Sequence, residues 1–169
     1  MIFGKIKRKS RGVITIVSGL PRSGTSLMMK ILEAGGMEVV VDNIRKADKD
    51  NPLGYYEYEK VKTIREDSSW LKGAEGKAFK MVSRLLYDLP ADNIYYKIIF
   101  MRRNMVEILT SQRRMLERRG TDESGAPDEE MGRIFKRHLA EIAKWIEIQR
   151  NMSVMYVSYN EIMAHRGLA

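Results

Sequence analysis

The chain has 169 residues, of which 44% are hydrophobic and 31% are charged, and its formal net charge is +8. This length favours a single domain with one hydrophobic core. Because cysteine is absent, the chain can form neither a disulfide framework nor a thiolate metal site, which fits a reducing compartment. The apolar stretch at residues 13–17 is too short for a membrane span or a signal peptide, so we expect a cytoplasmic protein.

The first half of the chain alternates between strand-like and helical patterns. Residues 13–18, VITIVS, are rich in β-branched side chains and are bounded by glycines, which predicts a buried strand. Residues 25–34 carry apolar side chains at helical spacing and are followed by Gly35 and Gly36, which predicts a helix and its end. The next segments are predicted to be a short strand, a long ordered loop and a helix, at residues 37–41, 42–60 and 59–70.

The second half continues this alternation. Two strands are predicted at residues 77–83 and 95–101. Asn104 and Glu107 then have the spacing of a capping box, which predicts a helix that runs to Arg119. The remaining segments are predicted to be an acidic connector, a long helix with one apolar face and a last strand, at residues 120–129, 131–146 and 154–159. Strands that alternate with helices predict an α/β fold, with a parallel sheet covered on both faces.

Basic residues concentrate in two places. The segment KIKRKSR at residues 5–11 is typical of a solvated arm, so we assign residues 1–12 to a basic N-terminal arm and residues 13–169 to one α/β domain. The second group consists of Arg102, Arg103, Arg113, Arg114, Arg118 and Arg119. Such a balance suits an anionic partner: a nucleotide, a nucleic acid, a polyanionic substrate or a membrane surface.

The segment GLPRSGTS at residues 19–26 joins the first predicted strand to the first predicted helix. A loop in this position aims backbone N–H groups and the positive end of a helix dipole at one point, and Gly19 and Gly24 allow an anion to approach closely. Thr25 and Ser26 add hydroxyl groups, and Arg22 adds a charge-assisted donor. The spacing resembles that of a Walker A loop, but Thr25 occupies the lysine position. The sequence therefore predicts an anion-binding loop without its usual lysine; the alternative is a tight structural turn.

A loop that uses ATP also needs an acidic residue at a strand end to help hold magnesium. Here the predicted strand at residues 95–101 is followed by Arg102 and Arg103, which disfavours a P-loop kinase and indicates an anion handled without a metal. Arg103 at the strand end and Ser111, two helical turns beyond Asn104, are predicted to face the ligand crevice and to grip a second phosphate. The alternative is that Arg103 caps the strand and that Ser111 faces solvent.

Taken together, GLPRSGTSL and MRRNMVEILTS resemble the sulfotransferase family that uses 3′-phosphoadenosine 5′-phosphosulfate (PAPS) and releases 3′-phosphoadenosine 5′-phosphate (PAP). NPLGYYE and VMYVSYNEI are similar to segments of bacterial sulfotransferase-family proteins, and the resemblance covers residues 13–162. It implies a P-loop-like three-layer sandwich with a central, mainly parallel sheet. It also implies that Arg103 and Ser111 hold the 3′-phosphate. The residues implied to hold the 5′-phosphosulfate are Arg22, Ser23, Gly24, Thr25 and Ser26.

The acceptor side of the site follows the resemblance less closely. Many relatives use a histidine or glutamate as general base, but His138 and His165 lie in segments away from the predicted cleft. We therefore take Glu57, among three tyrosines, as the candidate base; the alternative is an exposed loop glutamate. Lys80, together with Arg22, is the candidate to stabilise the oxygen that bridges sulfur and phosphorus in PAPS as that bond breaks. The alternative is that Lys80 is an ordinary lysine on an edge strand. Weaker candidate bases are Asp42, Asp48 and Asp50.

The expected function is metal-independent transfer of a sulfuryl group from PAPS to a hydroxyl or amine acceptor, either a small molecule or a glycan. Relatives usually continue past the VSYNE segment, whereas this chain stops at Ala169. One alternative is therefore a non-catalytic or truncated nucleotide-binding relative, and a P-loop kinase is a less favoured one. A nucleic-acid partner is not expected, because charge alone suggests one; steep salt dependence of DNA or RNA binding would support that alternative.

Overall fold

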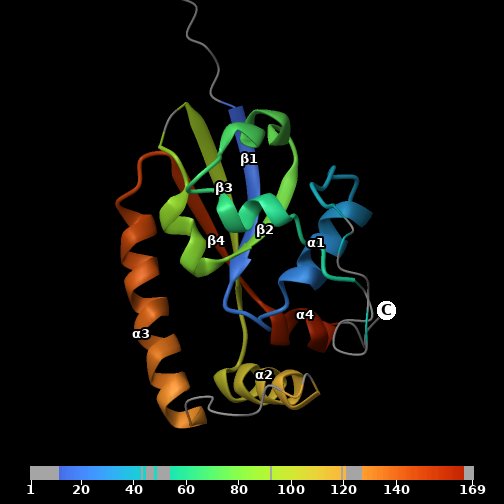
Figure 1. Ribbon diagram of the computed structural model, residues 1–169, viewed down its shortest axis with the longest axis vertical. Helices are drawn as coiled ribbons and strands as arrows, with labels where there is room; N and C mark the ends of the chain where they lie inside the picture. The colour runs from blue at the N-terminus through green and yellow to red at the C-terminus, as the bar shows by residue number, and fades with distance from the viewer. Residues whose placement is uncertain are drawn as a thin grey trace, which may run out of the picture.

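The computed structural model describes residues 12–42, 44, 48, 54–91, 93–118, 120 and 127–165. Its centre is a parallel four-stranded sheet with the strand order β2-β1-β3-β4 (Figure 1). The strands are β1 (Gly12–Gly19), β2 (Ala78–Val82), β3 (Ile94–Arg102) and β4 (Met152–Ser158). Gly19 of β1 pairs with Val82 of β2 and with Met101 of β3, so these strands end together at one carboxyl edge.

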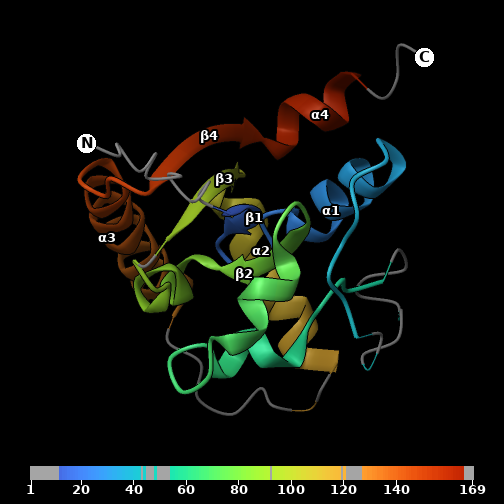
Figure 2. The ribbon, with the colours of Figure 1, turned by 90° about the horizontal axis from the view of Figure 1, so that it is seen from above.

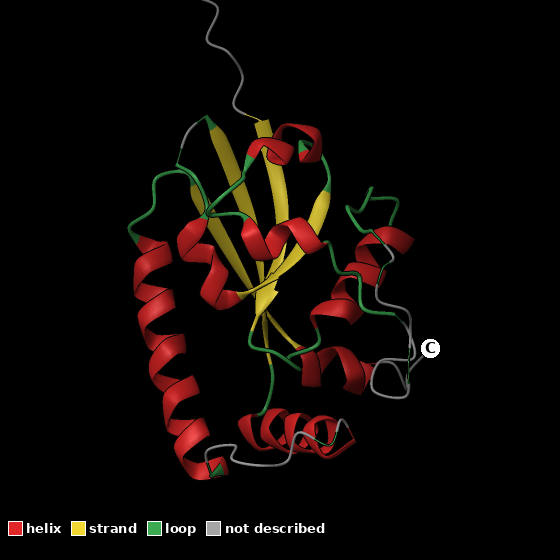
Figure 3. Ribbon diagram, in the orientation of Figure 1, coloured by secondary structure: helices red, strands yellow, loops and turns green. Residues whose placement is uncertain are grey.

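Helices cover both faces of this sheet and lie beyond its carboxyl edge (Figure 3). The α-helices are α1 (Thr25–Ala34), α2 (Met105–Arg118), α3 (Asp128–Glu147) and α4 (Tyr159–His165). The described residues also contain three 3₁₀ helices: η1 (Glu59–Thr63), η2 (Ser69–Ala74) and η3 (Ser83–Asp88). In Figure 1, α2 lies beyond the carboxyl edge, at the bottom of the view. Within the described residues, none of the helices combines the length and the apolar composition that a membrane crossing requires.

The two faces of the sheet have separate hydrophobic cores. Alternate side chains such as Ile16 and Phe100 pack on one face with Ile142 of α3 and with residues of the 3₁₀ helices. The intervening side chains, among them Val17 and Ile99, pack on the other face with methionines of α1 and partly buried residues of α4. Seen from above, α3 and α1 lie on opposite sides of the sheet (Figure 2). Strands buried on both faces explain the continuous apolar runs in the sequence. The predicted α/β fold, a three-layer sandwich around a parallel sheet, is confirmed.

Two element predictions in the first half of the chain were wrong. The strand predicted at residues 37–41 is reduced to one parallel bridge between Val39 and Ala78. The helix predicted at residues 59–70 is instead the two short helices η1 and η2. Between them, the backbone N–H of Ser69 donates to Oδ1 of Asp67 at 2.9 Å. Such a local side-chain bond offers the backbone an alternative to the helical ladder, so the chain turns at this point.

Boundaries shifted at other predicted elements. Gly12, assigned to the basic arm, begins β1, and residues 1–11 of that arm lie outside the described residues. The last strand ends at Ser158, because Tyr159 begins α4, a helix that the sequence analysis did not predict. Residues 121–126 of the acidic connector also lie outside the described residues, and α3 already begins at Asp128.

Candidate anion-binding site

The loop between β1 and α1 is built so that only glycine fits at two positions. Gly19 has φ 150°, and a Cβ there would lie 2.5 Å from Oγ of Ser23 and 2.7 Å from the carbonyl oxygen of Met101. Gly24 has φ 98°, and a Cβ there would collide with the ring of Tyr159. Arg22 between them has φ 68°, which is uncommon for a non-glycine residue and is found at ligand-binding loops. The glycines of the sequence motif are therefore required by this tight turn.

The amino end of α1 faces this turn. Gly24 caps the helix without a side-chain hydrogen bond, and its carbonyl accepts the N–H of Met28 at 3.2 Å. The first N–H groups of a helix carry partial positive charge and bind anions. Ser23 is 1% exposed, and its Oγ has no hydrogen-bond partner among the described residues. A buried hydroxyl without a partner is costly unless a ligand or water satisfies it, so this position fits an anion with acceptor oxygens.

An ammonium group reaches the loop from the neighbouring strand. Nζ of Lys80, on β2, donates to Oγ of Ser26 in the first turn of α1 at 3.0 Å. Oγ of Ser26 in turn donates to the carbonyl oxygen of Tyr55 at 3.1 Å. The tyrosine-rich loop, residues 42–60, therefore meets the loop between β1 and α1 at this hydroxyl. The hydroxyl of Tyr55 is itself bonded to both carboxylate oxygens of Asp48 at 2.7 Å. The structure thus brings together Ser26 and Lys80, which the sequence analysis had named separately.

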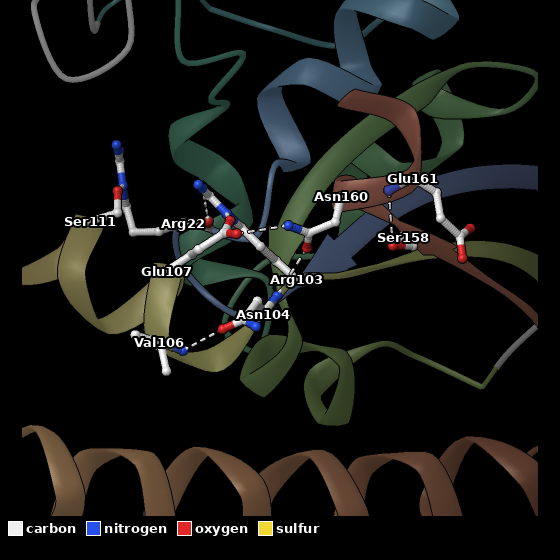
Figure 4. Close-up of polar contacts among 9 residues, drawn as sticks. All are labelled: Arg22, Arg103, Asn104, Val106, Glu107, Ser111, Ser158, Asn160 and Glu161. Atoms are coloured by element: carbon white, nitrogen blue, oxygen red, sulfur yellow. Dashed lines mark hydrogen bonds and ion pairs between the residues drawn. The ribbon is translucent and has the colours of Figure 1, made fainter. Parts of the chain in front are cut away.

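A second group of cations lies on the other side of the same turn. Nε of Arg22 donates to Oγ of Ser111 on α2 at 2.9 Å, and Nη1 of Arg103 donates to the carbonyl oxygen of Arg22 at 3.0 Å (Figure 4). Arg103 follows the end of β3, so its backbone starts at the carboxyl edge, where open α/β sheets bind ligands. Arg103 and Ser111, predicted as a pair, are therefore joined through Arg22.

The start of α2 differs from the predicted capping box. Oδ1 of Asn104 accepts the N–H of Val106 at 2.9 Å, as an N-cap does. The carboxylate of Glu107, however, does not return to the N–H of Asn104, which donates instead to Oδ1 of Asn160 at 3.1 Å. Glu107 accepts from Nε of Arg103 and from Nδ2 of Asn160, both at 2.8 Å. The hydrogen bond from Arg103 is the main reason why the pKa of Glu107 lies below its ordinary value. The hydrogen bond between Arg103 and Glu107 joins two ionised groups, which makes it charge-assisted from both sides.

The candidate base Glu57 lies near the lysine side of the site. It is two residues beyond Tyr55, whose carbonyl contacts Ser26, and two extended residues span at most about 7 Å. The neighbouring tyrosines are engaged in other contacts. The hydroxyl of Tyr56 donates to Glu33 at 2.6 Å, which raises the pKa of Tyr56 to about 12, and the ring of Tyr58 packs against Trp70. The role of Glu57 as base stays a prediction.

The aspartates that were weaker candidates serve the conformation of the tyrosine-rich loop. The carboxylate of Asp42 accepts the backbone N–H groups of Ile44 at 3.0 Å and of Glu59 at 2.6 Å. Asp48 holds the hydroxyl of Tyr55, as described above. Asp50 lies outside the described residues. Among those residues, no group of three or more His, Cys, Asp or Glu side chains is placed to hold a metal ion.

His138 lies closer to the carboxyl edge than the sequence analysis expected. Its Nε2 is 2.8 Å from Oγ of Ser83, which directly follows β2 and is 1% exposed. Burial, with a smaller contribution from nearby Arg84, lowers the pKa of His138. A sequence signal was available: His138 is spaced four residues from Ile134 and from Ile142, on the apolar face of the helix. The contact joins α3 to the end of β2. His165 is exposed, in the last turn of α4.

A cavity of about 340 Å³ lies at the carboxyl edge, beside the loop between β1 and α1. Its lining is mainly apolar and includes Leu20, Ser23, Phe100, Arg103, Ile108 and Tyr156. The guanidinium of Arg102 is 3.8 Å from the centre of the Tyr156 ring, at the border of this cavity. The sequence carries no signal for this cavity, because its walls come from the loop between β1 and α1, from β3 and β4, and from α2 and α3.

No protein-family model matches the chain, and no curated protein matches it. Among solved structures, the crystal structure of an uncharacterized protein from Eubacterium ventriosum is similar over 94% of this chain and 99% of that chain. The two sequences are 12% identical, and the TM-score is 0.34. A likeness at this level does not support an inference about function.

Proposed function

We propose that this protein binds PAPS and transfers its sulfuryl group to a hydroxyl or amine acceptor without a metal ion. The observation that carries the proposal is the 3.0 Å contact between Nζ of Lys80 and Oγ of Ser26. It supplies an ammonium to the first turn of α1, although Thr25 stands where the loop of an ATP-using enzyme carries its own lysine. A cation delivered from a neighbouring strand suits an anion that is bound without magnesium.

The arrangement of cations also supports a donor with two separate anionic groups. Lys80 and the amino end of α1 serve the first group, and the unsatisfied hydroxyl of Ser23 adds a donor there. Arg22, Arg103 and Ser111 form the second cluster, on the side of the loop toward α2. The apolar cavity beside them offers space for the organic part of a nucleotide. PAPS has this composition: a 5′-phosphosulfate, a 3′-phosphate and a purine base.

Each residue has a defined role in the proposed reaction. The acceptor oxygen or nitrogen forms a bond to sulfur while the bond between sulfur and the bridging oxygen breaks, and the electron pair stays on the departing 5′-phosphate. Lys80, Arg22 and the backbone N–H groups of the loop stabilise the charge that develops there. Ser23, Gly24, Thr25 and Ser26 hold the phosphosulfate, and Arg103 and Ser111 hold the 3′-phosphate. Glu57 accepts the proton that the acceptor loses.

The test is transfer of ³⁵S from labelled PAPS to a panel of aromatic, carbohydrate and amine acceptors, with EDTA present throughout. We expect labelled product and stoichiometric release of PAP from the wild-type chain, and strongly reduced product from Lys80→Met. A parallel reaction with γ-labelled ATP and magnesium tests the kinase alternative. Transfer of phosphate rather than sulfate would refute the proposal. Binding of PAPS without any consumption across the panel would support the non-catalytic alternative.

A further inference from the structure

The first turn of α4 is fixed to the first turn of α2 by one side chain. Asn160 uses both ends of its amide: Oδ1 accepts the N–H of Asn104 at 3.1 Å, and Nδ2 donates to Oε1 of Glu107 at 2.8 Å (Figure 4). A flipped amide would place Nδ2 against the N–H of Asn104, donor against donor, and Oδ1 against the carboxylate of Glu107, acceptor against acceptor, so the two bonds together set its orientation. The YNE segment, which the reaction described above does not use, therefore has a structural partner next to the proposed 3′-phosphate site.

Glu107, which Asn160 holds, in turn binds Arg103. Its two carboxylate oxygens have different partners, Oε1 with Asn160 and Oε2 with Nε of Arg103. Glu107 also lies in the first turn of α2, where the helix dipole favours a negative charge. The carboxylate is thus held on both sides, and it fixes one edge of the arginine.

Arg103 is restrained in three directions. Nε is held by Glu107, Nη1 donates to the carbonyl oxygen of Arg22, and the guanidinium lies 4.2 Å from the centre of the Tyr159 ring. The Arg103 side chain is only 20% exposed. A guanidinium has five N–H groups, and these contacts use two of them. The remaining three, including both on Nη2, can donate to a phosphate without breaking the contacts that hold the side chain.

We propose that Glu107, oriented by Asn160, is a positioning residue that aims Arg103 at the 3′-phosphate and so sets the preference for a 3′-phosphorylated nucleotide. This inference rests on the proposed function. The opposite role, a carboxylate that competes with phosphate for Arg103, fits the contacts less well. Both oxygens of Glu107 already have partners, and Nη2 is not needed for its bond to the arginine.

The test compares the dissociation constants of PAP and of 5′-AMP, which lacks the 3′-phosphate, by calorimetric titration. Glu107→Gln keeps the shape of the side chain but leaves one oxygen for two donors. We expect the affinity for PAP to fall about tenfold while that for AMP stays the same. Asn160→Ala is expected to weaken the binding of PAP relative to that of AMP as well, but by a smaller factor. Glu117→Gln is the matched control, because Glu117 faces Arg113 at the same spacing on the same helix, at 4.0 Å; it should leave both affinities unchanged.

A second readout reports the position of Arg103 without any nucleotide. In ¹⁵N NMR spectra, the Nε–H of Arg103 should exchange slowly in the wild-type chain and rapidly in Glu107→Gln. Tighter binding of PAP by Glu107→Gln would overturn the proposal in favour of competition. An equal loss for PAP and AMP, or an unchanged Nε–H signal, would overturn it in favour of a merely structural role. Failure of the wild-type chain to bind PAP would be a distinct result, which overturns the proposed function and this inference with it.

Discussion

Replacing Gly19 by alanine tests the geometry of the anion-binding loop. The backbone has φ 150°, and the added Cβ would lie 2.5 Å from Oγ of Ser23 and 2.7 Å from the carbonyl oxygen of Met101. Met101 is the register partner of Gly19 on β3, so its carbonyl cannot move without disturbing the sheet. The substitution therefore combines backbone strain with a steric clash against a central strand.

The expected loss of stability is the sum of these two contributions, and two other glycines serve as controls that separate them. Backbone strain in such a sparsely populated conformation costs about 1–3 kcal/mol, and overpacking adds about 1–3 kcal/mol, so Gly19→Ala should lower the free energy of unfolding by about 2–6 kcal/mol. Gly36 has φ 88° with no atom near the added Cβ, so Gly36→Ala should show the strain alone. Gly73 has neither feature, and Gly73→Ala should change stability by at most about 0.5 kcal/mol.

Urea denaturation of the three variants and the wild-type chain measures these differences directly. The prediction is a ranking, with Gly19→Ala the most destabilised, Gly36→Ala intermediate and Gly73→Ala close to wild type. In addition, only Gly19→Ala should lose affinity for PAP, because the loop must open to admit the methyl group. A loss of stability at Gly19 no larger than at Gly73 would refute the close approach of the loop to β3.

Three further predictions concern the lysine, the histidine and the core. Lys80→Met should lower the rate of PAP release from PAPS by about 10²-fold, the usual cost of losing one donor to developing charge. Burial lowers the pKa of His138 below 6.5, so the unfolded chain takes up a proton before the native one does. The contribution of neutral His138 to the free energy of unfolding is present above pH 6.5 and is lost as the pH falls through the lower native pKa. Urea denaturation at a series of pH values should show that the free energy of unfolding decreases over this range, and His138→Gln should remove that decrease. Ile142 of α3 is 1% exposed and packs against the sheet. Ile142→Ala should therefore lower the free energy of unfolding, measured by urea denaturation, by about 2–5 kcal/mol.

Much of the fold could be predicted because local patterns and tertiary packing agree. The helix predicted at residues 25–34 is α1 with the same bounds, since glycines flank a helical apolar pattern on both sides. The strands at the centre of the sheet were found because burial on both faces leaves continuous apolar runs. The helix predicted at residues 59–70 was wrong, because a local hydrogen bond from the N–H of Ser69 to Asp67 interrupts a sequence pattern that is compatible with a helix.

The residues of the candidate site could be predicted from the sequence, but most of the contacts between them could not. Arg22, Lys80, Arg103 and Ser111 were each singled out, because glycine loops and strand ends locate ligand sites in α/β folds. Arg103 and Ser111 were predicted as a pair, but the contacts of Lys80 with Ser26 and of Arg22 with Ser111 were not predicted, because they join residues 54 and 89 positions apart in the sequence. Glu107 illustrates the limit: its spacing from Asn104 indicated a capping box, but Arg103 and Asn160, brought close by the fold, are its partners.

The most direct test of the central claim is calorimetric titration of the wild-type chain with PAP, with and without magnesium, beside Arg103→Ala and with ATP as the competing ligand. Our account predicts tight binding of PAP that does not depend on magnesium and that is greatly weakened in Arg103→Ala. Magnesium-dependent binding of ATP, with no binding of PAP, would contradict it.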